Sequence, residues 1–237
     1  MSVLAFLVVA GAAAAGSAQP ESDVSIKETR RILDDYGTCI VKRWPKVASE
    51  AIVRNVDNHE LVTRYKRLID GSCLPVRRAG ALRVRFMGDQ YRYALAAALV
   101  RRELAAQPAP ILDGVPMLVH REAVAPGKLS PKGKPLTPAQ YAAALKGYEE
   151  AKAFNFISRY GECVVRVNPA AVRALLLSRP ETDEERMRFT ALSTAFGTCL
   201  PEGQTLSFGK LPLRGTLAVN YYRLAMAAAS MPRAPVQ

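Results

Sequence analysis

The stretch Tyr36-Gly37-Thr38-Cys39-Ile40-Val41-Lys42 decides the predicted fold, because it returns later in the chain as Tyr160-Gly161-Glu162-Cys163-Val164-Val165-Arg166. A second stretch repeats in the same order, since Gly71-Ser72-Cys73-Leu74-Pro75 matches Gly197-Thr198-Cys199-Leu200-Pro201. These four stretches contain all four cysteines. Positions 39 and 163 lie 124 residues apart and positions 73 and 199 lie 126 apart, a period typical of a small domain and too long for a solenoid repeat. The sequence therefore predicts a tandem duplication of two similar units.

The four cysteines are expected to form one disulfide in each unit. Four cysteines allow three pairings, and the duplication favours Cys39–Cys73 with Cys163–Cys199 because each unit then carries its own bridge. Each bridge would close a loop of about 35 residues, which the chain-entropy estimate values at about 3.5–4 kcal/mol. The alternative is four reduced, buried cysteines that pack as small apolar side chains.

The chain start favours the disulfides, because residues 1–18 have the pattern of a secretory signal peptide. An apolar run from Val3 to Ala10 is followed by small residues, and Gly16-Ser17-Ala18 is similar to a signal-peptidase site. The run is too short to span a bilayer, and no later stretch approaches about 18 uncharged apolar residues. One feature is atypical, since no Lys or Arg precedes the run. We expect a periplasmic or secreted protein, in a compartment where disulfides persist, without a transmembrane segment after cleavage.

The rest of the chain predicts a mainly α protein with two homologous helical units, at 25–106 and 137–230. Apolar residues in both units recur at three- and four-residue steps, which is the period of one helix face. A linker at 107–136 separates the units and contains six prolines, so regular structure is not expected throughout it. Its apolar residues between 111 and 119 are expected to lie on one of the units.

Local signals place helix starts and close helix contacts. Asp57, Thr137 and Thr182 are each followed three residues later by Glu or Gln, which is the capping pattern of a helix N-terminus. Gly37 and Gly161 fall inside predicted helices, where glycine is unfavourable. We interpret them as sites where a missing side chain lets a neighbouring helix approach closely enough for the disulfide; a kink at that point is the alternative.

The net charge of +12 indicates affinity for acidic partners. Residues 26–106 contain 17 basic and 9 acidic side chains and residues 137–230 contain 11 and 8, so the excess lies mainly in the first unit. An acidic cell-envelope polymer or another periplasmic protein is the expected partner, and nucleic acid is not expected for an exported protein. The densest basic cluster is a predicted anion-binding loop, with a merely solvated loop as the alternative: Arg77, Arg78, Arg83 and Arg85.

Residue patterns of known catalytic or metal sites are missing from the sequence. The two histidines, His59 and His120, have no second ligand at metal-binding spacing and are interpreted as ordinary surface residues. No Cys-x-x-Cys, Gly-x-Ser-x-Gly or phosphate-binding glycine loop is present. Asp34-Asp35 and Glu149-Glu150 are adjacent pairs whose side chains diverge on a helix, so they do not form an acid/base dyad. No catalytic residue, cofactor or metal is predicted.

The repeated cysteine stretches resemble a group of small secreted proteins from sphingomonad-type alphaproteobacteria with duplicated Gly-x-Cys units. The resemblance rests on the two Tyr-Gly-x-Cys stretches and on the Cys-Leu-Pro stretches that precede an arginine-led helix. It implies an exported protein of a Gram-negative bacterium. It assigns no catalytic residue, because the group has no established activity.

The sequence thus favours an exported, non-catalytic, envelope-associated binding or interaction protein. The first alternative is a periplasmic enzyme whose site is built from Arg, Tyr and Asp or Glu side chains without a diagnostic motif. The second is a structural or stress protein without a small ligand.

Overall fold

The computed structural model describes residues 26–74, 89–130, 132–203 and 209–231. The predicted signal peptide at 1–18 and the four arginines at positions 77, 78, 83 and 85 lie outside the described residues. Within those ranges the fold is mainly α, as predicted, and no β-strand is present. None of the helices in the described part of the chain is long and apolar enough to cross a bilayer.

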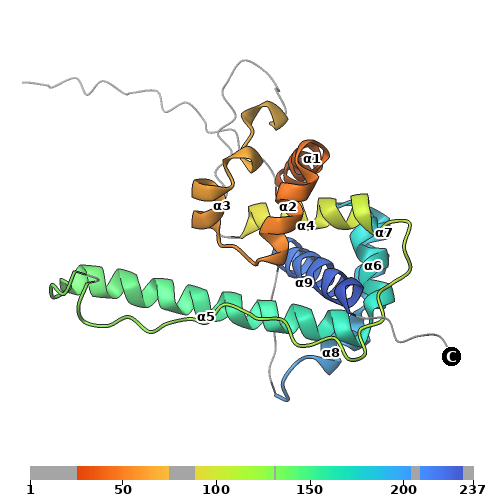
Figure 1. Cartoon of the computed structure of the whole chain (residues 1–237). Coiled ribbons are helices and arrows are strands. Elements are labelled where there is room, and N and C mark those ends of the chain that lie inside the picture. Colours follow the sequence, from red (N-terminus) through yellow and green to blue (C-terminus); the bar gives the residue numbers. More distant parts are fainter. Residues whose placement is uncertain (1–25, 75–88, 131, 204–208, 232–237) are drawn as a thin grey trace, which may run out of the picture.

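The two halves of the chain have a similar order of elements. Each begins with a long helix, continues with two short helices and a turn or short helix beside the second cysteine, and ends with a long helix (Figure 1), while the first half has an additional 3₁₀ turn at Lys66–Leu68. Common descent of the two halves stays a prediction. The elements are α1 (Ile26–Arg43), α2 (Pro45–Val53), α3 (Asn58–Arg64), the 3₁₀ turns η1 (Lys66–Leu68) and η2 (Gly71–Cys73), α4 (Gln90–Glu103), α5 (Pro138–Val167), α6 (Pro169–Leu177), α7 (Asp183–Ala191), α8 (Ser193–Thr198) and α9 (Lys210–Ser230).

The predicted capping residues begin the helices. Asp57 accepts a hydrogen bond from the Glu60 amide at 2.7 Å, and Thr182 accepts one from the amide three residues later. Thr137 and Gln140 form a reciprocal capping box at the start of α5. These bonds satisfy amides that a helix leaves unpaired in its first turn.

Helices α4 and α9 form the centre of the molecule. Every residue from Tyr91 to Val100 and every residue from Arg214 to Ala225 is buried, as expected for helices covered on all sides. Helix α1 packs on α4, α5 packs on α9, and α4 and α9 pack on each other. The apolar core is therefore one cluster that contains residues from both halves of the sequence.

Two glycines permit this packing. A Cβ atom on Gly37 would lie 2.5 Å from the carbonyl oxygen of Ala94 in α4, and a Cβ atom on Gly161 would lie 2.7 Å from Oγ1 of Thr216 in α9. The predicted close approach is confirmed. The approaching helices, however, are the two central ones and not the segments that carry the partner cysteines.

The disulfides have the predicted pairing. Cys39 is bonded to Cys73 and Cys163 to Cys199. Each bond joins the first long helix of its half to the cysteine of the Cys-Leu-Pro stretch, which is the last residue of η2 in the first half and directly follows α8 in the second.

Candidate functional site

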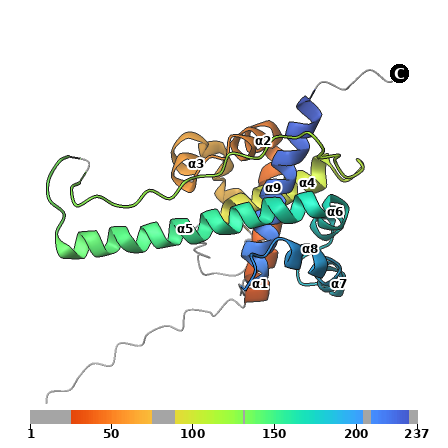
Figure 2. The same cartoon turned by 90° about the horizontal axis from the view of Figure 1, so that it is seen from below.

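The linker crosses both halves of the molecule before it reaches α5. Figure 2 shows it passing over α9 and beside α2, and then running along α5. Val115 is buried, and Leu112 and Leu118 pack against the core. Met117 and Val119 face outward with exposed fractions of 70% and 81%. The linker is therefore held on the fold by three side chains that recur every third residue, and it presents Met117 and Val119 at the surface.

A buried carboxylate, that of Glu162 in α5, holds the linker in place. Its Oε1 atom accepts hydrogen bonds from the Leu118 amide at 3.0 Å and from Arg166 Nε at 2.9 Å. Its Oε2 atom lies 2.6 Å from His120 Nε2. Arg166 also donates to the carbonyl oxygens of Val115 and Pro116, at 3.0 and 2.7 Å. We call Glu162, Arg166 and His120, with the linker backbone they bind, the linker clamp.

The pKa of Glu162 reflects this clamp. Burial alone would raise the pKa of its carboxyl group, but hydrogen bonds from His120, the Leu118 amide and Arg166 outweigh burial and lower it. Glu162 is therefore a carboxylate at neutral pH, and all its partners act as donors.

The position of His120 contradicts the prediction that it is an ordinary surface residue. Its side chain is only 4% exposed and lies between Glu162 and Ser158, whose Oγ atom is 2.8 Å from Nδ1. A carboxylate only accepts hydrogen bonds, so Nε2 of His120 carries a proton and donates it to Glu162, while Nδ1 forms the second hydrogen bond of the ring, with the Ser158 hydroxyl. The surface interpretation was wrong, because a lone histidine in a proline-rich segment gives no local signal of a partner 42 residues away.

Ser158, His120 and Glu162 thus form a Ser–His–Glu row with the hydrogen-bond order of a hydrolase triad, although the two ring nitrogens exchange roles relative to the usual arrangement. Ser158 is only 9% exposed, lies within α5, and does not line the large hollow that His120 borders. Glu162 also shares its charge with Arg166. These features fit a clamp that fixes the linker better than a nucleophile that meets substrate.

A hollow of about 670 Å³ lies between the linker, the end of α2 and the last turns of α9. Its volume falls in the range of about 300–1,000 Å³ typical of small-molecule sites. Arg54, Arg121 and Arg223 line it together with His120, and no Asp or Glu is among the described residues of its wall. We call it the arginine groove.

Arg223 is the buried cation of the arginine groove, with an exposed fraction of 7%. Its Nη2 atom donates to the carbonyl oxygen of Val119 at 2.9 Å, whereas Nε and Nη1 have no hydrogen-bond partner among the described residues. Burial, followed by the charge of Arg92, lowers the pKa of Arg223 to about 10, so it stays charged at neutral pH. Buried charges are normally paired, which makes this guanidinium exceptional.

The other two arginines lie nearer to solvent. Arg121 donates to the backbone oxygens of Asn55 and Val56 and lies 3.7 Å from Asp89. The Arg54 side chain is 56% exposed and its contact with Glu50 is long, at 3.4 Å. Both ion pairs are long, and neither Glu50 nor Asp89 is among the residues that line the groove, so the described wall of the groove carries positive charge.

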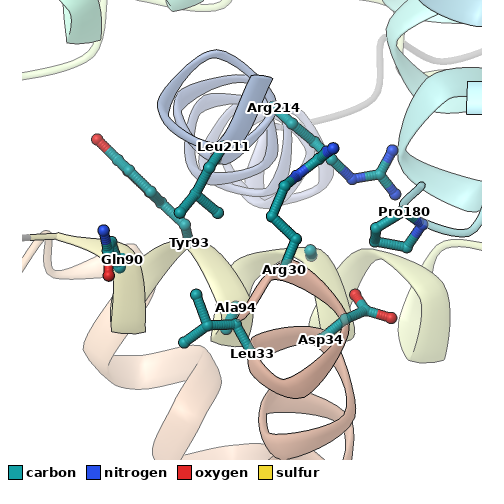
Figure 3. Close-up of a pocket in the computed structure, with 11 residues that line it drawn as sticks. Arg30, Leu33, Asp34, Gln90, Tyr93, Ala94, Pro180, Leu211 and Arg214 are labelled. Carbon is teal, nitrogen blue, oxygen red and sulfur yellow. The ribbon is translucent and has the colours of Figure 1, made fainter. Parts of the chain in front are cut away.

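A second buried charge cluster has a different character. Figure 3 shows Arg30 of α1 beside Arg214 of α9. Both donate to Glu185, at 2.6 and 3.2 Å, and Arg30 also pairs with Glu181. Arg214 further donates to the carbonyl oxygens of Leu175, Leu176 and Ser178. The adjoining hollow of about 30 Å³ has room for about one water molecule, so this satisfied cluster joins the two halves and leaves no space for a ligand.

The remaining sequence candidates within the described ranges do not come together into a site. His59 is exposed in the first turn of α3. Asp34 pairs with Arg101 at 2.7 Å, and Glu149 pairs with Lys152 on the exposed part of α5. Among the described residues, no group of three or more His, Cys, Asp or Glu side chains could hold a metal ion. The predicted anion-binding arginines, Arg77, Arg78, Arg83 and Arg85, lie outside the described ranges.

Comparison with protein-family models, with curated proteins and with solved structures yields no match. The function is therefore argued from the geometry of the arginine groove and the linker clamp.

Proposed function

We propose that the chain is an exported, non-catalytic binding protein that takes anionic molecules of the cell envelope into the arginine groove. One observation carries the proposal: among the described residues, three arginines and no carboxylate line a hollow of about 670 Å³. A guanidinium donates paired hydrogen bonds to carboxylate or phosphate oxygens in a geometry that suits both anions. The net charge of +12 adds a field that attracts such ligands.

The compartment belongs to the same proposal. The signal-peptide pattern at 1–18 supports export, and the two disulfides support an oxidising location such as the periplasm or the exterior. The loop of Arg77, Arg78, Arg83 and Arg85 stays a separate proposal for an anionic contact.

Titration calorimetry with inorganic phosphate tests the arginine groove. Hydrogen bonds to charged groups are worth about 1.5–3 kcal/mol each, so replacing both Arg54 and Arg121 by Gln should weaken binding at least about tenfold. The matched control replaces Arg186 and Arg188 by Gln, because these arginines are exposed in α7 and form only surface ion pairs. Equal affinity in the groove variant and the control, with both folded by circular dichroism, would reject the site.

An enzyme is the second candidate, and the Ser158–His120–Glu162 row favours it. If the row is catalytic, a fluorophosphonate probe should label the intact chain at Ser158, and Ser158→Ala should abolish the labelling. We expect no labelling, because the hydroxyl lies on a buried face of α5. Labelling that is lost in Ser158→Ala would replace the binding proposal with a hydrolase.

A further inference from the structure

The arginine groove has an apolar border. Four of the large apolar side chains that are exposed in the described structure line it: Val53, Met117, Val119 and Met231. Exposed apolar side chains are normal when scattered singly, but a group around one hollow indicates an interaction site. These four come from α2, the linker and the end of α9, so the fold brings them together around the arginines.

The positions of the arginines indicate where a charged group would sit. Arg54 and Arg121 are partly exposed and would meet an anion directly. Arg223 lies deeper, and its unpartnered nitrogens are covered in this structure, so it contributes a positive potential from below. A charged end group near Arg54 and Arg121 leaves the apolar border for the rest of the ligand.

We propose that the ligand of the arginine groove is an anionic amphiphile with a single aliphatic chain. Its carboxylate or phosphate group binds Arg54 and Arg121, and its chain covers Met117, Val119 and Met231. This inference rests on the proposed function and adds the chemical class of the ligand. A single molecule is favoured over a membrane surface, because Arg223 is 7% exposed within a hollow that a bilayer surface would not enter.

A chain-length series tests this inference. Inorganic phosphate, butyl phosphate, hexyl phosphate and octyl phosphate are titrated into the exported protein below their micelle concentrations. Burial of one methylene group is worth about 0.8 kcal/mol, or about fourfold in affinity, and the groove is open on one side. We therefore expect affinity to rise about two- to fourfold for each added methylene. Octyl glucoside, which has the same chain and no charge, should bind at least about tenfold more weakly than octyl phosphate.

Matched variants separate the chain from the charged group. Replacing Met117 and Met231 by Gln should flatten the chain-length dependence and leave phosphate affinity unchanged. Met187→Gln is the control, because Met187 in α7 is also exposed, at 62%, and lies away from the groove. The Gln variant of Arg54 and Arg121 should weaken every phosphate ligand by a similar factor.

The outcomes distinguish this inference from the proposed function. If phosphate binds through Arg54 and Arg121 but affinity does not depend on chain length, the amphiphile is rejected and the anion site stands. If neither phosphate nor its alkyl esters bind, both proposals fail. Retention on anionic vesicles without binding of monomeric octyl phosphate would also reject a single-molecule ligand.

Discussion

Removing the Glu162 carboxylate should destabilise the protein strongly, because this group holds the linker on α5. The variant Glu162→Ala leaves Arg166, His120 and the Leu118 amide without their acceptor. Removal of one partner from a buried ion pair costs about 3–5 kcal/mol. Arg166 is 20% exposed and keeps its bonds to two linker carbonyls, so we expect the lower end, about 3 kcal/mol.

Urea and thermal unfolding followed by circular dichroism measure this loss. For a chain of this size 1 kcal/mol corresponds to about 2–4 °C, so Tm should fall by about 6–12 °C. The control is Glu149→Ala on the exposed part of the same helix, whose ion pair with Lys152 is a surface contact and should change stability by less than about 0.5 kcal/mol. A loss below about 1 kcal/mol in Glu162→Ala would refute the clamp.

The clamp also predicts a pH dependence. The pKa of Glu162 in the folded protein lies below its ordinary value of 4.5, so the unfolded chain takes up the proton first as pH falls. The contribution of Glu162 to the free energy of unfolding is therefore complete above its ordinary pKa of 4.5 and is lost as pH falls through its lower pKa in the folded protein. Unfolding free energies of the wild type and Glu162→Gln should differ most at neutral pH and converge as pH falls below the ordinary carboxyl value of 4.5 and through the lower folded pKa. A constant difference across this range would contradict the proposed role of the carboxylate.

The remaining predictions concern the packing of α1 and the first disulfide. Gly37→Ala should destabilise the fold by about 1–3 kcal/mol, because its Cβ would lie 2.5 Å from the Ala94 carbonyl oxygen. Gly147→Ala, in open space on α5, should instead stabilise by up to about 1 kcal/mol, and equal urea midpoints for the two variants would contradict the close approach. Replacing Cys39 and Cys73 by Ser should cost about 3.5–4 kcal/mol, measured by urea unfolding, and a reductant should then have no further effect on that half; an unchanged midpoint would show that this bridge adds no stability.

Helix starts and disulfide pairing followed from the sequence because their signals are local or repeated. Asp57 caps an amide three residues away, and the capping box at Thr137 involves only residues within one stretch of four. The cysteine pairing followed from the repeated stretches and needed no knowledge of the tertiary structure. The two glycines were recognised as close contacts, but the helices that approach them could not be identified, because α4 and α9 are distant in sequence.

The candidate site could hardly be predicted from the sequence. Arg223 meets Val119 across 104 residues, and the arginine groove joins α2, the linker and α9. No periodicity or motif in the sequence indicates that these distant segments lie side by side. The predicted anion-binding loop was chosen because its arginines are close in sequence, whereas Arg54, Arg121 and Arg223 become neighbours only in the folded chain.

The sequence by itself determined that the chain is helical, where several of its helices begin and which cysteines pair, because these properties depend on neighbouring residues or on a visible repeat. Only the tertiary structure decided that α4 and α9 share one core, that the His120 side chain is buried against Glu162, and that three arginines line one hollow whose described wall has no carboxylate. Those features depend on which helix surfaces meet, and this choice is made by the packing of side chains that are far apart along the chain.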